Sequence, residues 1–495
     1  LIAKEKVDHD LNRSRERSNA FLWDDEYILL AVTETDGDEK SITTTETSTP
    51  PVSDNIGETA YSKMWLYSLI LRVLKFLQAE PGDPDTIVSD TIDSELEEEL
   101  CCLWDITVNR DVLPHLREFR LVPVFSGAVV RVLCPRLTCA APTRSPLPPP
   151  VQEISLGILA NLALDESECT QMTEEPTFII NILNLMGSTD TRILMELFRL
   201  LQAALASHSN RQAWLDAIHF TPEFFDRVTF ILCSSTNAGL LVNTISAVET
   251  IVRVDDSISE VWCNDQLLSS ILEAQKQMHW LHGDEVEVIH RLLYIFSSNR
   301  TGVQTLMSKY YDLYPGFGVY LRKVCEDEPH LIPFERYHNS LRAIIPVIDV
   351  IVSNLPLMSA LTTFDSDSDI LPCLFNIVWG CAQQEHLATC SISLTGLWED
   401  LSVMFGDLMR RVQDLLQEKM PTDSAGGGGT ASTPPASVSR TLRWLYCLEK
   451  STSPGLREAF VRCCLSRRGE VRGYLVYACH QLHLENLLEL VTDEN

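Results

Sequence analysis

Few residues of this 495-residue chain have the types and spacing that would support a reaction or hold a metal. Cys479 and His483 lie four residues apart, which places them on one face of a helix, and Cys463 and Cys464 lie upstream. Two helix ligands with an upstream cysteine could hold zinc, but no CxxC pair completes the set. A packed helix core therefore explains these residues better than a metal site.

Sequence motifs for other kinds of catalysis are also missing. The glycine run 426–429 has no Lys-Ser or Lys-Thr pair after it to bind phosphate and magnesium, and no strand is expected before it. A GxSxG nucleophile motif is absent. The acidic pair Glu97 and Glu99 is expected on exposed helix turns. We therefore expect no catalytic residue, no cofactor, no metal and no small-molecule substrate.

The stretch Glu153–Ala206 predicts three helices, each with a broad apolar face. The second ends at Gly187-Ser188, a pair that tolerates the left-handed turn of a helix stop, and Thr189 or Asp190 can cap the third. Apolar residues surround most of the third helix, so one neighbour cannot cover it. It needs a neighbour on each side, as in a solenoid of stacked repeats.

The pattern also repeats along the chain. ANLA at 160–163 recurs as AALA at 203–206 and as ETIV at 249–252, which are about 40 to 46 residues apart. This period is typical of armadillo and HEAT repeats, and SLGILANLA at 155–163 resembles the last helix of an armadillo repeat. The sequence therefore predicts an all-α, armadillo/HEAT-like helical repeat superhelix.

The armadillo resemblance implies a candidate partner-binding residue, because the Asn of that last helix binds the backbone of an extended peptide in armadillo proteins. Only Asn161 matches this pattern, since the equivalent positions hold Ala204 and Thr250. Where the companion tryptophan is expected, the chain has Gly157, Leu200 and Ser246. The candidate partner-binding residues are Asn161, Asn243 and Thr250, without a complete peptide-binding ladder.

Net charge and composition limit the classes of partner that we expect. A formal charge of −30 repels polyanions, so we expect protein partners and no nucleic acid. No stretch of about 18 uninterrupted apolar residues is present, so no membrane association is expected. The 15 cysteines are scattered through apolar positions, which is typical of a reduced, intracellular compartment.

Composition divides the chain into segments. Residues 1–54 are predicted to be a disordered tail, with an apolar island at 21–32 that could dock on the body as a helix. An armadillo-like domain is expected over 55–420, a flexible linker over 421–439 and a helical hairpin over 440–495.

Local signals give finer predictions. Thr59 is a candidate cap for a helix within 56–77, and Ser94 with Glu97 forms a capping box. Separate helices are expected at 303–311 and 316–324. Pro346 is expected to kink its helix or to begin a new one.

Five motifs together resemble the serum amyloid A-like protein family, an armadillo-type family associated with synovial fibroblast proliferation. They are IGxTxYSKxWL at 56–66, LWD at 103–105, LREF at 116–119, CPRL at 134–137 and GILANLA at 157–163. The resemblance implies an armadillo-type fold without enzymatic activity, a nuclear location with the cytoplasm as a further possibility, and promotion of proliferation after inflammatory stimuli. We therefore predict a protein-binding scaffold; the alternative is a transport-receptor or chaperone-like carrier on the same solenoid.

One segment departs from the family pattern. Family members run from CPRL almost directly into the GILANLA helix, whereas this chain inserts TCAAPTRSPLPPPVQ at 138–152. Prolines in this run favour an extended loop over a helix. A retained intron or gene-model error is the favoured explanation, and a polyproline ligand and a tolerated loop remain the alternatives.

Overall fold

The computed structural model describes residues 55–78, 92–131, 148–174, 176–278, 284–326, 328–357, 370–387, 393–419, 442–451, 453–466 and 469–493, together with the single residues 359, 435 and 438. Within these ranges the chain is all-α, apart from an isolated bridge between Asn55 and Ser62. The predicted all-α helical repeat fold is confirmed. None of the helices in these ranges is long and apolar enough to cross a membrane.

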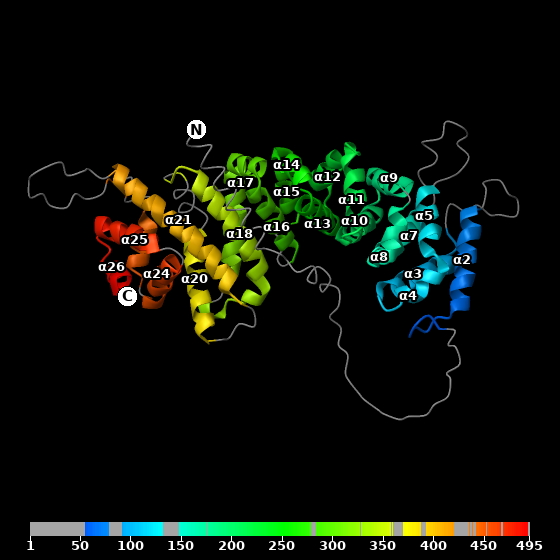
Figure 1. The fold of residues 1–495 in the computed structure, drawn as a ribbon, viewed down its shortest axis with the longest axis horizontal. Helices are drawn as coiled ribbons and strands as arrows, with labels where there is room; N and C mark the ends of the chain where they lie inside the picture. Colours follow the sequence, from blue (N-terminus) through cyan, green and yellow to red (C-terminus); the bar gives the residue numbers. More distant parts are fainter. Residues whose placement is uncertain are drawn as a thin grey trace, which may run out of the picture. The chain divides into compact units, whose positions relative to one another are not determined.

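The chain divides into two compact units at Ile258 and Ser259. We call the described residues 55–258 the N-terminal unit and 259–493 the C-terminal unit (Figure 1). This division differs from the boundaries at 420 and 440 that composition suggested.

The N-terminal unit is a series of helices of unequal length. They are α2 (Lys63–Gln78), α3 (Ser94–Val108), α4 (Leu113–Leu116), η2 (Arg117–Phe119), α5 (Leu121–Arg131), α7 (Pro149–Leu162), α8 (Glu166–Thr173), α9 (Pro176–Asn184), η3 (Leu185–Gly187), α10 (Thr191–Ala206), α11 (Arg211–His219), α12 (Glu223–Ser234) and α13 (Ala238–Val254). The triplets α8–α9–α10 and α11–α12–α13 have the short–middle–long order of armadillo repeats.

The last helix of each repeat packs side by side with its neighbours. Helix α3 contacts α7, α7 contacts α10, and α10 contacts α13. Because α10 lies between two partners, Phe198 and Leu200 are both fully buried although their spacing of two residues places them on nearly opposite sides of the helix. The apolar circumference of α10 is thus explained by a neighbour on each side, as the sequence predicts.

The C-terminal unit contains two rows of helices. Its elements are α14 (Asp256–Trp262), which crosses the boundary, α15 (Asp265–Gln277), α16 (Asp284–Ser298), α17 (Arg300–Val324), η4 (Pro329–Leu331), α18 (Phe334–Asn354), α20 (Ile370–Leu387), α21 (Thr395–Lys419), α23 (Arg443–Glu449), α24 (Pro454–Leu465), α25 (Gly469–Leu482) and α26 (Glu485–Asp493). One row runs α16, α18, α21, α25 and the other α17, α20, α24, with contacts between successive members.

The segment predicted as a separate hairpin, 440–495, packs directly on the helices before it. Helix α24 contacts both α20 and α21, and α25 contacts α21. Phe375, Phe405, Trp444 and Phe460 form one aromatic cluster with ring centroids 5.3 to 6.3 Å apart. The end of the chain therefore continues the helix rows, because burying these rings requires α20, α21, α23 and α24 together.

Polar contacts reinforce the row in the C-terminal unit. The guanidinium of Arg411 donates hydrogen bonds to the carbonyls of Val352 and Leu355, which close the end of α18. Such carbonyls lack partners within their own helix, so a cation there satisfies them. Arg342 of α18 and Asp400 of α21 form an ion pair at 3.3 Å.

Two predicted helix caps are wrong and one is confirmed. Ser94 lies inside the first turn of α3, and Asp93 at the cap makes no side-chain hydrogen bond. Helix α2 begins later than expected, with the Ser62 hydroxyl accepting from the Trp65 amide at 3.1 Å in place of Thr59. Asp190 does cap α10, accepting from two backbone amides of its first turn.

Two predictions about proline are wrong, and for Pro346 the alternative that a new helix begins there is also wrong, whereas a kink at Pro346 stays a prediction. Helix α18 continues through Pro346, and α17 continues through Pro315, which joins the two helices predicted there. Burial of long apolar faces outweighs the hydrogen bond that each proline removes. Pro149 and Pro150, expected in an extended loop, form the first turn of α7. Their missing amides cost little there, because first-turn amides have no helical partner.

Other predictions fall outside the described residues. These are the tail at 1–54, the part of the insertion at 138–147, and the linker at 421–439 except residues 435 and 438.

The stacking of α10 between α7 and α13 gives a first testable prediction. Leu201 is fully buried, so Leu201→Ala removes apolar surface and leaves a cavity between repeats. We expect the free energy of unfolding to fall by about 2–5 kcal/mol in a urea titration. A loss below about 0.5 kcal/mol would contradict the packing of α10 described above.

Candidate protein-interaction face

The last helices of the repeats present a common polar face. We call it the third-helix face, and define it by Glu97, Cys101, Trp104 and Asp105 of α3, Glu153 and Asn161 of α7, Arg192, Glu196, Arg199 and Gln202 of α10, and Asn243, Ser246, Thr250 and Arg253 of α13. Their spacing along each helix places them on one side. Contacts between the helices, given below, show that these sides adjoin.

Asn161 is the polar centre of this face. It is 4% exposed, and its amide nitrogen donates to the Thr107 hydroxyl at 2.9 Å and to the Trp104 carbonyl at 3.3 Å. Its amide oxygen accepts from the Arg199 guanidinium. Both donors and the acceptor of the side chain are therefore used inside the unit. The structure places Asn161 where it links α3, α7 and α10.

Trp104 and Gly157 fit together between α3 and α7. A Cβ atom at Gly157 would lie 2.2 Å from Cε2 of the Trp104 indole, which no real contact allows. Thus Gly157 is required by its neighbour and not by its own backbone conformation. The indole from the preceding helix covers the position at which the armadillo pattern expects a tryptophan.

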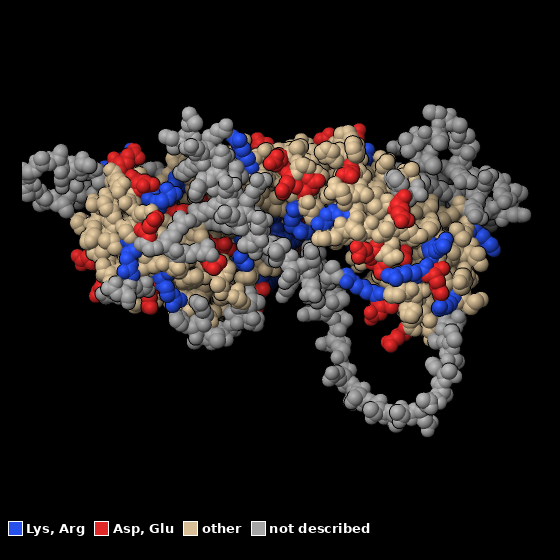
Figure 2. All heavy atoms as spheres, in the orientation of Figure 1, with Lys and Arg blue, Asp and Glu red and all other residues tan. Residues whose placement is uncertain are grey.

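Ion pairs connect α7 and α10 along the same face. Arg192 pairs with Glu153 at 3.6 Å, and Arg199 pairs with Glu196 at 2.9 Å. Burial raises the pKa of the Glu153 carboxyl, and Arg192 opposes this shift. Burial likewise raises the pKa of Glu196, against the opposing charge of Arg199. On the face of the N-terminal unit that Figure 2 draws, acidic and basic side chains lie among one another.

The two candidates on α13 are more accessible than Asn161. Asn243 and Thr250 are both half-buried. The Asn243 carbonyl accepts from the Gln202 side chain at 3.2 Å, which joins α10 to α13, and the Thr250 hydroxyl donates within its own helix to the Ser246 carbonyl. The face therefore carries Asn161 on α7 and both Asn243 and Thr250 on α13, with α10 between the two helices, and the binding role of these residues stays a prediction.

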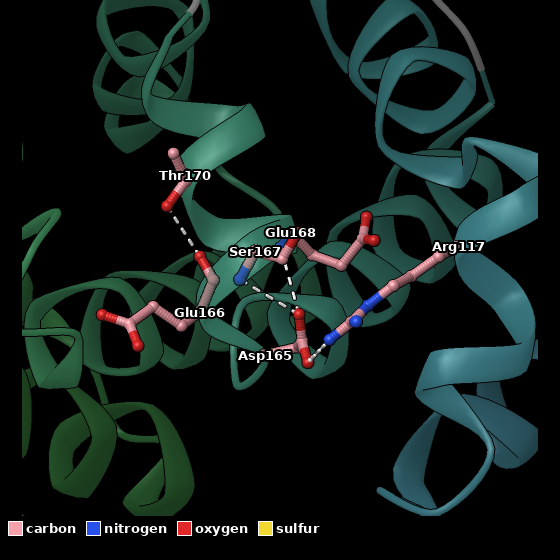
Figure 3. Close-up of polar contacts among 6 residues, drawn as sticks. All are labelled: Arg117, Asp165, Glu166, Ser167, Glu168 and Thr170. Carbon is pink, nitrogen blue, oxygen red and sulfur yellow. Dashed lines mark hydrogen bonds and ion pairs between the residues drawn. The ribbon is translucent and has the colours of Figure 1, made fainter.

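A second polar cluster lies at the start of α8, where one repeat follows another (Figure 3). Asp165 accepts from the amides of Ser167 and Glu168, and Arg117 of η2 pairs with its other carboxylate oxygen at 2.5 Å. Burial raises the pKa of Glu168, the Asp165 charge adds to this shift, and Arg117 opposes it. The cluster caps α8 and fastens it to η2, so a structural role accounts for its residues.

The cysteine and histidine group near the end of the chain does not form a site. Helix α25 ends at Leu482, and His483 has a left-handed backbone with φ of 55°. Cys479 is buried whereas His480 and His483 are exposed, so the helix face that would join Cys479 to His483 does not exist. Within the described ranges, no group of three or more His, Cys, Asp or Glu side chains could hold a metal ion.

The buried cysteines have the electrostatics of core residues. Burial raises the pKa of Cys169 and Cys263 to about 11, and of Cys463 and Cys479 to about 12. Nucleophilic cysteines need a lowered pKa, because the thiolate is the reactive form. These four thiols therefore pack as small apolar side chains.

Sequence reasoning missed the residues that hold the face together. Trp104 and Arg199 carry its central contacts, yet neither was among the candidates. The glycine at position 157, within an otherwise bulky apolar helix, was the available signal that a large neighbouring side chain occupies that space.

Comparisons with known proteins place the chain among relatives of one kind. A family model described as the SAAL1 C-terminal domain matches residues 224–479. Protein saal1 of Danio rerio is 29% identical over 279 residues, which cover 53% of this chain and 56% of that protein. Protein SAAL1 of Homo sapiens is 26% identical over 276 residues, covering 51% and 55%. The matched regions thus span little more than half the length of these relatives.

Among solved structures, the chain aligns with the crystal structure of Uso1-2. It covers 89% of this chain and 65% of its own, with 10% sequence identity and a TM-score of 0.44.

The fit between Trp104 and Gly157 gives a second prediction. Gly157→Ala forces the indole to move, so we expect the free energy of unfolding to fall by about 1–3 kcal/mol. In a Trp104→Ala background the same substitution should cost under about 0.5 kcal/mol, because the clashing ring is gone.

Gly127→Ala is the matched control, since a Cβ there meets nothing within 4 Å. It lies in α5 and should leave stability unchanged or slightly raised. An equal cost for Gly157→Ala with and without Trp104, measured by urea titration, would contradict the steric explanation.

The raised pKa of Glu196 gives a third prediction. A carboxyl with a raised folded-state pKa stabilises the fold fully below its ordinary pKa of 4.5 and loses that contribution as pH rises through the folded value. Glu196→Gln removes this titration. The free energy of unfolding of the variant should therefore fall less than that of the parent protein as pH rises above about 4.5.

Urea titrations over a pH series would measure this difference. Glu98→Gln, at an exposed position of α3, is the control and should follow the parent protein. If the Glu196→Gln profile is parallel to the parent profile, Glu196 does not titrate as its burial requires.

Proposed function

This chain belongs to the SAAL1 family, and we propose that it is a non-enzymatic scaffold that binds other proteins through its third-helix face. The observation that supports this most is the continuity of that face over α3, α7, α10 and α13. A partner segment lying across it meets side chains from several repeats at once, whereas each helix alone offers only a few.

The third-helix face combines fixed and accessible groups. Asn161 and Trp104 are held by contacts between helices, so they keep Arg199 and the surrounding side chains in place. Asn243 and Thr250 are half-buried and keep side-chain surface for a partner. We assign contact with the partner to Asn243 and Thr250, and a positioning role to Asn161.

The charge of this face favours a polypeptide of mixed charge. Glu153 and Glu196 are only partly neutralised by Arg192 and Arg199, and the whole chain carries a formal charge of −30. Polyanions are repelled by such a chain, so the proposal excludes nucleic acid. Donors and acceptors of both kinds on the face suit the backbone and polar side chains of a protein segment.

Family membership extends the proposal to a cellular role. By resemblance to the family, we place the scaffold in promotion of fibroblast-like cell proliferation after inflammatory stimuli, with a nuclear location. Cells that produce the parent protein or a variant with an altered third-helix face would be compared. Their proliferation tests the proposed role, and the position of a fluorescent fusion tests the nuclear location.

Affinity capture with the full chain tests the binding proposal. Asn243→Arg with Thr250→Arg places two large cations on the face, and proteins held there should be recovered about tenfold less. Ile180→Arg with Phe230→Arg is the matched control, because both residues are exposed on α9 and α12. Its recovery should equal that of the parent protein.

Equal recovery with both double variants would contradict binding through this face. Recovery at fixed stoichiometry supports a scaffold. Recovery that is transient and released by nucleotide would instead favour a cargo carrier on the same solenoid.

A further inference from the structure

Helix α2 exposes an apolar stripe on its outer side. Met64, Tyr67 and Leu71 are 67%, 50% and 58% exposed, and their spacing of three and four residues places them in one line. Leu66, Leu69 and Val73, on the opposite side, are buried against the rest of the unit. Thus α2 is apolar on both sides.

This stripe differs from other exposed apolar side chains of the described residues. Elsewhere the large exposed apolar residues occur singly on a helix or in a connection, such as Ile180 on α9 and Phe230 on α12. Single exposed apolar residues are normal on soluble proteins, whereas a line of three on one helix is a candidate docking surface, although one side of the Tyr67 ring already packs on Phe119 at 4.7 Å between ring centroids.

The position of α2 in the N-terminal unit makes its exposed apolar stripe unusual. In Figure 1, α2 lies at the outer edge of the N-terminal unit, beyond α3 and α5. A solenoid needs a polar outer face on such a helix to stay soluble. Helix α26 of the C-terminal unit follows this rule, because Glu485, Asn486 and Glu489 occupy its exposed positions. Helix α2 does not.

We propose that residues 21–32 of the same chain, FLWDDEYILLAV, dock on α2 as a helix and cover Met64, Tyr67 and Leu71. Trp23, Tyr27 and Leu30 of this segment are spaced by four and three residues, so a helix would present them as one apolar line. The two lines are of similar length, and one covers the other.

Chain geometry allows this docking. Asn55 forms a bridge with Ser62, the residue that caps α2, so the preceding chain joins the unit beside the start of this helix. Residues 33–54 connect the segment to Asn55, and a chain of this length without regular structure would have an end-to-end distance of about 25 Å. Helix α2 has 16 residues and is therefore about 24 Å long. The connection reaches every part of the stripe.

Charge favours the same occupant. Helix α2 carries Lys63, Arg72 and Lys75 and no acidic residue; Lys63 pairs with Glu118 and Arg72 with Glu95 and Glu99, so the exposed Lys75 is the cation that favours an acidic segment. The docking segment carries three successive acidic residues, Asp24 to Glu26. The tether further favours the segment over any free partner, because it gives an effective concentration in the millimolar range.

Photo-crosslinking of the full chain tests the proposal. A photoreactive amino acid replaces Trp23, and crosslinked peptides are identified by mass spectrometry. We expect crosslinks to 63–78, formed within one chain. Mixing isotope-labelled with unlabelled protein distinguishes these from crosslinks between copies.

Two variants make the test specific. Leu71→Glu places a carboxylate on the stripe beside the acidic segment, so the yield of crosslinks to α2 should fall about tenfold. Ile180→Glu is the matched control on α9 and should leave the yield unchanged. Both residues are exposed, so both variants should fold, which thermal unfolding verifies.

Crosslinks mainly between copies, crosslinks to other helices, or a yield that Leu71→Glu leaves unchanged would each overturn the proposal. None of these outcomes bears on the third-helix face, which lies on other side chains and is tested separately.

Discussion

The structure of the N-terminal unit depends on burial of the last helix of each repeat from two sides. Helix α10 contacts α7 on one side and α13 on the other, so its leucines are buried in several directions. Burying a leucine contributes about 1.5–3 kcal/mol, and this gain exists only when both neighbours are present. Each repeat therefore stabilises the next, and the polar residues of the third-helix face are confined to the margin of this apolar layer.

That confinement explains why the polar residues of the third-helix face are so tightly engaged. Asn161 lies at the margin of the apolar layer, where an unsatisfied amide would cost about 1–3 kcal/mol. It is satisfied by Thr107, Trp104 and Arg199, which belong to α3 and α10. The same packing that buries the leucines thus fixes the positions of the charged groups. A face that is ordered before binding loses little conformational entropy when a partner arrives.

The sequence predicted the fold class from its apolar patterns, because a helix surrounded by leucines has few alternatives to a stacked array. It predicted less well where long-range contacts outweigh local signals. Pro346 remains inside α18 and Pro315 inside α17, since the neighbouring helices hold both together. Asn161 was recognised from its local pattern, but its partner Arg199 was not, because they are 38 residues apart in the chain. The Trp104 and Gly157 contact is likewise a property of two helices.

The two ways of ending a helix row differ in what they require. A helix whose outer side is polar, such as α26, is complete when its inner side is packed, because Glu485 and Glu489 are hydrated. A helix with Met64, Tyr67 and Leu71 outside remains incomplete after its inner side is packed. Covering these residues with a tethered segment restores the condition that α10 meets with its two neighbours, namely a layer on each side. A helix with two apolar sides needs a packed layer on each. This requirement accounts for the position of α10 and also points to the outer side of α2 as the place for a further helix.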